Sequence, residues 1–372
     1  MTPSRRSLFL LLLIVSLGFA LRLYHLDTRP FWFDENLTVD LAAAPPRYVL
    51  DTIDRPPLYY ILLHEWTSLV GSSPFTLRFF SLWWGTLALV FFYRLARQLI
   101  DRRLSLWALL LATFSPFYVY YAQEARTYAL TLALALISCW ALLVWLKQRR
   151  ARYLLLNAAA TLGCLYAHYS LLLLPFVQTI FVLLTLWRKR QPSQPSFATP
   201  ITLGLNFYVP LPHHLPKPKF KFLRKISLLW QWLIAQAIII VLFLPWPIHA
   251  CYGLRELFAP QANPSPFTAL QQVANFVRTT LLEFSATQSL PWPIAEAIAL
   301  AFVGLIVLGL LSSTPPKLSR RFLSIVLLLP PLIMLLLPRT SVYYAPKYLI
   351  VITPAFYILT VVGRSNRWRS LW

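Results

Sequence analysis

Carboxylates are concentrated in one short segment of a very hydrophobic chain. The sequence contains 12 Asp and Glu residues against 34 Lys and Arg residues, and six of those 12 acids lie between residues 27 and 54. The stretch FWFDENLTVD at 31–40 places two of them side by side, at Asp34 and Glu35. A carboxylate can take the proton from a hydroxyl group that attacks another molecule. Asp34 and Glu35 are therefore candidate catalytic residues.

Charged and aromatic residues recur in short polar stretches farther along the chain. An arginine fork matches the oxygens of a phosphate group, and fixed positive charge stabilises a phosphate that departs as an anion. Together with a carboxylate base, such residues suit the transfer of a group from a phosphate carrier to a hydroxyl. The candidates in these stretches are Glu124, Arg126, His168, Tyr169, Arg339, Tyr343, Tyr344, Lys347 and Tyr348.

The composition indicates the elements that must hold these residues. Hydrophobic residues make up 58% of the 372 residues and charged residues 12%, whereas a soluble domain carries about 25% charged residues. Several uncharged runs approach the ~20 residues that cross a bilayer. The sequence therefore predicts an all-α polytopic membrane protein. Its net charge of +22 is typical of basic inner loops, so we expect membrane lipid and no nucleic acid as a partner.

About ten apolar segments are candidate transmembrane helices. One further apolar segment, 58–70, has 13 residues and would reach about 20 Å as a helix, against about 30 Å of hydrocarbon core. We predict that it lies along the membrane surface. We also expect the first span to be retained and not cleaved as a signal peptide. The candidate spans are 7–24, 78–97, 104–121, 127–146, 153–167, 169–187, 228–249, 291–312, 322–338 and 348–363.

Charge distribution then predicts which loops face which side. With the N-terminus inside and 58–70 not spanning, 24 of the 34 Lys and Arg residues fall on the inner side, as the positive-inside rule requires. Residues 24–77 become a large first outer loop, and 188–227 becomes a flexible basic inner linker. We expect residues 1–372 to form a single membrane-embedded domain in the plasma membrane, with the candidate site facing the periplasm or exterior.

The motifs in order resemble the polyprenyl-phosphate-sugar-dependent glycosyltransferases of the C superfamily, in the branch of protein O-mannosyltransferases and aminoarabinose transferases. FDEN in the first outer loop is similar to the acidic motif of that family, and SPFYVYYAQEARTYAL to its second motif. RPPLYYILLHEW, YAHYSLLLLP and APKYLIVITPAF are similar to stretches between and after them. The resemblance covers residues 28–187 most clearly, and 241–249 and 338–356 more weakly.

The resemblance implies an inverting transfer of a hexose or pentose from a polyprenyl phosphate to an acceptor hydroxyl. It implies Asp34 as the base, and Glu35 as a residue that supports Asp34 or contacts the acceptor. The residues implied to face the phosphate or sugar are Arg55, Glu124, Arg126, His168, Lys347 and Tyr348. Relatives often carry His where Arg55 stands. The acceptor class stays open between a glycolipid, a polysaccharide and a protein.

Two other functions remain open. The protein could be a transporter or flippase of lipid-linked sugars, or a non-catalytic relative that acts as a membrane scaffold. A transporter is expected to place ionisable groups near the bilayer midplane. We expect no cofactor. Asp34, Glu35 and Glu124 could hold a divalent cation if they meet, but the resemblance implies that side-chain cations suffice, so we expect no metal.

Overall fold

The computed structural model describes residues 5–52, 55–187, 218–249, 266–286, 290–336 and 345–369. These residues form helices and turns and no strand. The first half contains α1 (Arg5–Leu23), α2 (Phe33–Ala43), α3 (Pro46–Thr52), α4 (Leu58–Val70), α5 (Pro74–Leu99), α6 (Arg102–Thr113), α7 (Pro116–Ala122), α8 (Tyr128–Gln148), α9 (Ala151–Ala167), η1 (Tyr169–Leu172) and α10 (Leu173–Trp187). The second half contains α11 (Pro218–Phe243), α12 (Pro245–His249), α14 (Pro266–Ser285), α15 (Trp292–Leu311), α16 (Lys317–Leu336), η3 (Pro346–Ile352) and α17 (Thr353–Arg369).

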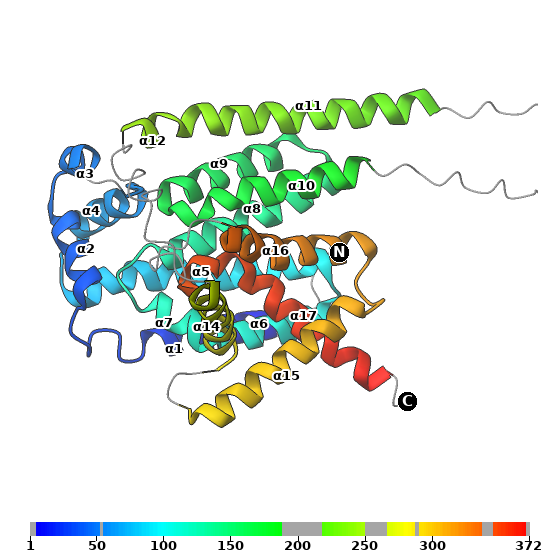
Figure 1. Ribbon diagram of the computed structural model, residues 1–372. Helices are drawn as coiled ribbons and strands as arrows, with labels where there is room; N and C mark the ends of the chain where they lie inside the picture. Colours follow the sequence, from blue (N-terminus) through cyan, green and yellow to red (C-terminus); the bar gives the residue numbers. More distant parts are fainter. Residues whose placement is uncertain are drawn as a thin grey trace, which may run out of the picture.

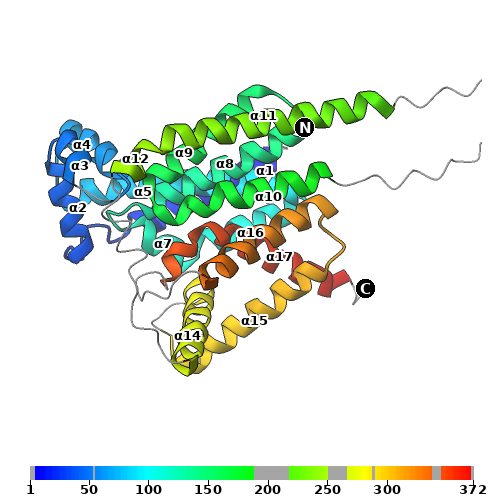
Figure 2. The same ribbon diagram turned by 45° about the horizontal axis from the view of Figure 1, so that its top comes forward.

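The long helices run side by side as a bundle (Figures 1 and 2). Helix α8 lies at its centre and packs against α5 and α9, while α15 packs on α17. Helices α2, α3 and α4 gather at one end of the bundle, and both chain termini lie toward the other end (Figure 1). The polar segment that contains Asp34 is therefore at the end opposite the termini.

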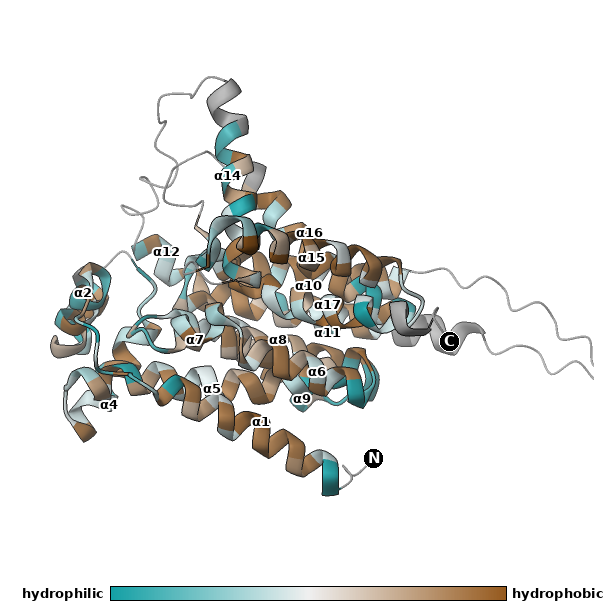
Figure 3. Cartoon of the chain, turned by 90° about the horizontal axis from the view of Figure 1, so that it is seen from below, coloured by the Kyte–Doolittle hydropathy of each residue, from teal (hydrophilic) through white to brown (hydrophobic). Residues whose placement is uncertain are grey.

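The predicted number of about ten spans is not confirmed. Among the described residues, seven helices are long and apolar enough to cross a membrane, or eight if the bent pair α6–α7 counts as one span. Helix α9 has only 17 residues, and α16 begins with the charged residues Lys317, Arg320 and Arg321. In Figure 3 the long helices are largely hydrophobic, and hydrophilic residues gather toward the ends of the bundle.

The 58° bend between α6 and α7 follows from the local sequence. Pro116 lacks the N–H that would continue α6, and Ser115 caps α7 by accepting a hydrogen bond from the Tyr118 N–H. The break leaves carbonyl groups of α6 unpaired. Arg22, fully buried in the last turn of α1, donates from Nη1 to the Thr113 carbonyl (3.3 Å) and to the Gly18 carbonyl (2.9 Å). A buried cation thus stabilises the carboxyl end of α6.

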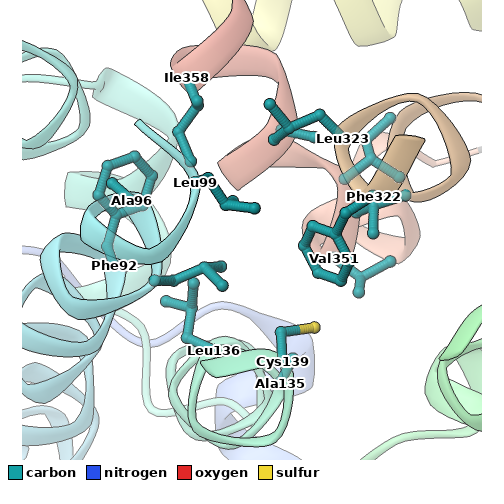
Figure 4. Close-up of a cluster of buried hydrophobic side chains, with 14 of the residues drawn as sticks. Phe92, Ala96, Leu99, Ala135, Leu136, Cys139, Phe322, Leu323, Val351 and Ile358 are labelled. Carbon is teal, nitrogen blue, oxygen red and sulfur yellow. The ribbon is translucent and has the colours of Figure 1, made fainter. Parts of the chain in front are cut away.

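The interior between α5, α8, α16 and α17 is apolar (Figure 4). Side chains from segments far apart in the sequence converge there, so the second half of the chain is packed on the first. This cluster fixes η3, which carries Lys347, against α8. The labelled members are Phe92, Ala96, Leu99, Ala135, Leu136, Cys139, Phe322, Leu323, Val351 and Ile358.

Helix α4 has the bounds predicted for the surface helix, Leu58–Val70. Two prolines precede it, and it ends at Gly71, whose φ of +90° favours glycine. It is not among the helices that can span a membrane. Its buried residues Tyr59, Tyr60 and Leu63 pack toward the bundle.

Two parts of the predicted organisation look different in the structure. Helix α11 begins at Pro218, so the last ten residues of the predicted linker 188–227 are helical, and 188–217 lie outside the described residues. Helix α14 was not predicted. It runs across the long axis of the bundle in all three views (Figures 1, 2 and 3).

Candidate active site

Glu35, in the first turn of α2, and Arg78, near the start of α5, form a buried ion pair. The Arg78 guanidinium donates from Nε to Oε1 (3.0 Å) and from Nη2 to Oε2 (2.8 Å) of Glu35. The side chains are 2% (Glu35) and 4% (Arg78) exposed. The Ala125 N–H also donates to Oε1, at 2.9 Å. Both carboxylate oxygens are therefore engaged, and Glu35 links α2 to α5 and to the turn between α7 and α8.

Arg78 also organises the chain that leads into α2. Its Nη1 donates to the carbonyl groups of Leu26 (3.1 Å) and Arg29 (2.8 Å), and its Nη2 donates to that of Pro30 (3.3 Å). A guanidinium group offers five N–H donors in a fixed plane, and here the plane holds a carboxylate and three backbone carbonyls together. Arg78 therefore ties α2 and the chain before it to α5.

Asp34 faces a different cation. The Arg126 Nη2 atom lies 3.3 Å from Asp34 Oδ2, and Arg126 Nη1 donates to the Asp34 carbonyl (3.0 Å) and to Thr38 Oγ1 (3.2 Å). The Asp34 side chain is 21% exposed, in contrast to the enclosed Glu35. Asp34 is thus a carboxylate that is held in place by a cation and still accessible.

Glu124 lies in the turn before α8 and is buried. Its Oε2 atom has no hydrogen-bond partner among the described residues. Burial raises the pKa of Glu124 from 4.5 to about 7, and the negative charge of Glu35 adds to this, although Tyr120, Arg126 and Lys347 act in the opposite direction. Glu124 is therefore a carboxyl group that can carry a proton near neutral pH.

Lys347 enters the same region from η3, with aromatic rings around it. Its Nζ atom lies 5.7 Å from the ring centre of Trp32, 5.5 Å from that of Tyr128 and 5.6 Å from that of Tyr348. Aromatic faces attract an ammonium group at such distances. The three rings come from segments that precede α2, begin α8 and form η3, so Lys347 marks where these segments meet.

His168 lies between two of these rings. The ring-centre distances are 5.7 Å to Tyr128 and 5.3 Å to Tyr348. Burial, together with the positive charges of Arg126, Lys347 and Arg55, lowers the pKa of His168 from 6.5 to about 3. The imidazole is therefore neutral at ordinary pH, and its Nδ1 accepts a hydrogen bond from the Ser170 N–H (3.1 Å).

The structure gathers the predicted residues at one end of the bundle. Arg55 is exposed, yet its charge acts on His168. Arg339, Tyr343 and Tyr344 lie outside the described residues. The residues in contact or in electrostatic interaction are Asp34, Glu35, Arg55, Glu124, Arg126, His168, Lys347 and Tyr348.

Arg78 and Trp32 belong to this site and were not predicted from the sequence. Arg78 lies inside an apolar run and looked like part of a span. The one signal for Arg78 was a charge at the polar end of a long hydrophobic helix, which is rare unless the charge has a partner.

Asp34, Glu35 and Glu124 lie at the same end of the bundle, and divalent cations bind carboxylate oxygens. Among the described residues, no group of three His, Cys, Asp or Glu side chains is placed to hold a metal ion. Glu35 is already engaged by Arg78 and by the Ala125 N–H. The expectation that the protein uses no metal stays a prediction.

The sequence profile of the family described as dolichyl-phosphate-mannose-protein mannosyltransferase matches residues 54–212. This segment includes α4 to α10, and therefore Arg78, Glu124, Arg126 and His168. No curated protein sequence matches the chain.

Solved structures share the fold over nearly the whole chain. ArnT from Cupriavidus metallidurans in the apo state is similar with a TM-score of 0.61 and 13% identity, over 96% of this chain and 61% of ArnT. ArnT bound to undecaprenyl phosphate gives a TM-score of 0.59 and 14% identity, with the same coverage. AglB, the oligosaccharyltransferase of Archaeoglobus fulgidus, in complex with an inhibitory peptide and a dolichol-phosphate, gives 0.55 and 14% identity, over 99% of this chain and 51% of AglB.

The chain spans about 61% of the length of ArnT and about half that of AglB. At these low sequence identities, the similarity to ArnT and AglB is a similarity of fold. The chain is nonetheless similar to membrane glycosyltransferases of the C superfamily both in sequence, over 54–212, and in fold, so the resemblance to polyprenyl-phosphate-sugar-dependent glycosyltransferases is confirmed.

Proposed function

We propose that this protein is an inverting glycosyltransferase that moves a sugar from a polyprenyl-phosphate carrier to an acceptor hydroxyl. One observation carries the proposal. An accessible carboxylate, Asp34, lies against Arg126, and that pair shares one end of the bundle with Lys347 and Arg55. A base and phosphate-binding cations are the groups that this transfer needs.

Asp34 is the base in this proposal. Its carboxylate accepts the proton of the acceptor hydroxyl while the hydroxyl oxygen forms a bond to the anomeric carbon of the sugar. The bond between that carbon and the phosphate oxygen breaks, and the polyprenyl phosphate leaves with the electron pair. Attack opposite the leaving group inverts the anomeric centre.

Arg126 and Lys347 stabilise the leaving phosphate. Arg126 contacts Asp34 through Nη2 and the backbone through Nη1, so it joins the base to the phosphate side. Lys347 lies among aromatic rings, without a carboxylate partner among the described residues, and its charge is available for a phosphate. Arg55, at the edge of the site, adds positive charge where the lipid headgroup enters.

Glu35 acts as a positioning residue in this scheme, because its carboxylate is enclosed by Arg78. Glu124, when protonated, donates a hydrogen bond to a phosphate oxygen. His168 and Tyr348 supply a neutral surface for the sugar ring, since aromatic faces pack on the C–H groups of sugars. The burial of Glu35 and Glu124 supports the roles proposed for these two carboxyl groups.

The comparisons support a lipid-linked donor. ArnT has been solved with undecaprenyl phosphate and AglB with dolichol-phosphate, and we extend this donor class to the present chain. The positive-inside count supports a site that faces the periplasm or exterior of the plasma membrane. The acceptor is a glycolipid, polysaccharide or protein hydroxyl.

The distribution of charge favours an enzyme over a transporter. In the described candidate spans the charged side chains lie toward the helix ends, as Arg22, Arg78, Arg94 and Lys147 do. The buried polar residues along the middle of the bundle, Ser138, Asn157 and Gln178, are uncharged and hydrogen-bond to one another. A transporter would place ionisable groups at that depth.

The decisive experiment measures sugar release from a panel of polyprenyl-phosphate sugars by the purified full chain, with cell lysate as the source of acceptor. Wild type is compared with Asp34→Asn and with Asp40→Asn. Asp40 is an exposed carboxylate on the same helix, so it is the matched control. We expect wild type and Asp40→Asn to turn over one donor, and Asp34→Asn to be slower by about 100-fold or more.

Turnover by Asp34→Asn at the wild-type rate would remove Asp34 from the role of base. If neither wild type nor the control turns over any donor, the scaffold reading replaces the enzyme.

A further inference from the structure

Arg94 is an arginine in a membrane-spanning helix, and it has no polar partner among the residues that the structure describes. It lies on α5, five residues before the end of that helix, or about 8 Å along its axis. Its side chain is exposed, and it makes no hydrogen bond or ion pair with the described residues. Its guanidinium stacks over the ring of Trp140 at 4.6 Å and near that of Phe91 at 5.7 Å. Stacking orients the group and leaves all its N–H donors available.

The rings under Arg94 continue across three helices. Phe91 of α5 meets Trp140 of α8 at 5.6 Å, and Trp140 meets Tyr153 of α9 at 5.8 Å between ring centres. Arg152 lies over Tyr153 at 4.8 Å and donates to its hydroxyl at 3.1 Å. We name these five residues the basic–aromatic patch. It presents two stacked guanidinium groups on one continuous aromatic surface.

The surroundings of the patch carry positive charge and no acid. Residues 91–100 and 145–156 contain no Asp or Glu. They add further cations to Arg94 and Arg152, namely Arg97, Lys147, Arg149 and Arg150. Asp101, the nearest acid in sequence, caps α6 by accepting a hydrogen bond from the Leu104 N–H. A ligand of this region must therefore be anionic.

The position of Arg94 near the end of a spanning helix indicates which class of anion the patch binds. An exposed side chain on a spanning helix faces lipid, and a charge there is costly unless it reaches a partner. Long arginine side chains near helix ends extend to the level of the headgroups, where phospholipid phosphates lie. The arginine fork matches phosphate oxygens, and basic sites between spanning helices bind anionic headgroups.

We infer that the basic–aromatic patch is a binding site for the headgroup phosphate of an anionic phospholipid. The site lies at the opposite end of α5 and α8 from Asp34 and Arg126, so it is separate from the proposed active site. Its function is to anchor α5, α8 and α9 in an anionic membrane. The inference does not depend on glycosyl transfer.

The test measures lipid binding to the purified full chain by native mass spectrometry, with phosphatidylglycerol and phosphatidylcholine of the same chain length. The variant Arg94→Gln/Arg152→Gln removes both stacked cations. The matched control Arg5→Gln/Arg6→Gln removes two exposed cations at the start of α1, with the same loss of charge. Thermal unfolding in each lipid provides a second readout, because a ligand that binds the folded state raises Tm.

We expect wild type and the control to retain phosphatidylglycerol over phosphatidylcholine, and the Arg94/Arg152 variant to bind phosphatidylglycerol about tenfold more weakly. The increase in Tm caused by phosphatidylglycerol should shrink in that variant alone. Inorganic phosphate should not displace the lipid.

Equal losses of phosphatidylglycerol binding in the two double variants would show that the lipid is attracted by net charge alone, and would overturn the proposed site. Equal binding of both lipids to wild type, or unchanged phosphatidylglycerol binding in the Arg94/Arg152 variant, would also overturn it. Arg94→Lys separates charge from geometry. The inference requires that this variant binds phosphatidylglycerol more weakly than wild type, because lysine lacks the planar fork.

Discussion

The guanidinium of Arg78 holds the carboxylate of Glu35 through two hydrogen bonds of 3.0 and 2.8 Å, across 43 residues of sequence. The pair is enclosed, so it fixes the first turn of α2 against α5. Asp34 precedes Glu35 on that turn, and successive helical residues point about 100° apart. Glu35 therefore faces Arg78 while Asp34 faces Arg126, which gives two adjacent carboxylates different environments.

Arg78→Met should destabilise the protein by about 3–5 kcal/mol, because it leaves the Glu35 charge buried without a cation to pair with. Denaturant or thermal unfolding in one detergent measures this loss. Arg47→Met is the control, since Arg47 pairs with Asp51 at 3.7 Å on the surface, where both side chains are largely exposed, and such pairs contribute little. An equal effect of the two substitutions would contradict the structural role of Arg78.

The double variant Glu35→Leu/Arg78→Met tests positioning apart from stability. Replacing both partners of a buried ion pair with apolar residues recovers much of the stability lost in the single variant. The three carbonyl contacts of Arg78 are still lost, so α2 should remain misplaced. We expect recovered unfolding stability with transfer activity still reduced at least tenfold, and full recovery of activity would remove the positioning role.

Glu124 should give the protein a measurable dependence of stability on pH. Its pKa is raised from 4.5 to about 7 by burial, so the folded state binds more protons than the unfolded state between these values. The contribution of Glu124 to the free energy of unfolding is fully present below pH 4.5. It falls by about 1.4 kcal/mol per pH unit toward pH 7. Relative to wild type, Glu124→Gln should gain stability as pH rises from 5 to 7.

The measurement compares unfolding free energies of wild type, Glu124→Gln and Asp40→Asn at several pH values. Asp40 is exposed, so its variant should keep the wild-type slope. A constant difference between wild type and Glu124→Gln across this range would show that Glu124 does not titrate there.

His168 should make the stability of the protein depend on pH in the direction opposite to that of Glu124. Burial and nearby cations lower its pKa from 6.5 to about 3, so the unfolded state binds more protons than the folded state below pH 6.5. The contribution of His168 to the free energy of unfolding is fully present above pH 6.5. It falls by about 2 kcal/mol between pH 7.5 and 5. His168→Gln should lose this dependence and gain stability relative to wild type on acidification. The same titration series measures it, and parallel curves for the two proteins would contradict a neutral buried imidazole.

Much of the site was predictable because its residues lie in short polar stretches between apolar runs. Any charge there must be at a membrane surface, which brings Asp34, Arg126 and Lys347 to the same end of the bundle once the topology is right. Helix α4 was predictable with its bounds, because Pro57 and Gly71 enclose it. These predictions require only the direction in which the chain crosses the membrane and the length of each segment.

The partners of Arg78 were not predictable, because they lie 43–52 residues away and no local pattern encodes their geometry. The different roles of Asp34 and Glu35 depend on the orientation of α2, which long-range contacts set. Helix α14 was missed because polar residues such as Gln271, Gln272 and Asn275 interrupt its apolar positions. Its stability comes from packing of residues such as Phe284 on Phe117.

Lys347 should determine the affinity for the phosphate of the donor. Its ammonium lies 5.5–5.7 Å from three ring centres, so Lys347→Gln removes the charge with little change in side-chain length. A hydrogen bond to a charged group contributes about 1.5–3 kcal/mol, which corresponds to an increase in KM for the polyprenyl-phosphate sugar of about 10- to 160-fold. Lys347→Arg keeps the charge and should recover much of the affinity, while Lys317→Gln, at the start of α16, should leave KM unchanged. Steady-state kinetics with donor varied at fixed acceptor measure these values. An unchanged KM in Lys347→Gln, together with a wild-type unfolding temperature, would place the donor phosphate away from Lys347 and leave Arg126 and Arg55 to bind it.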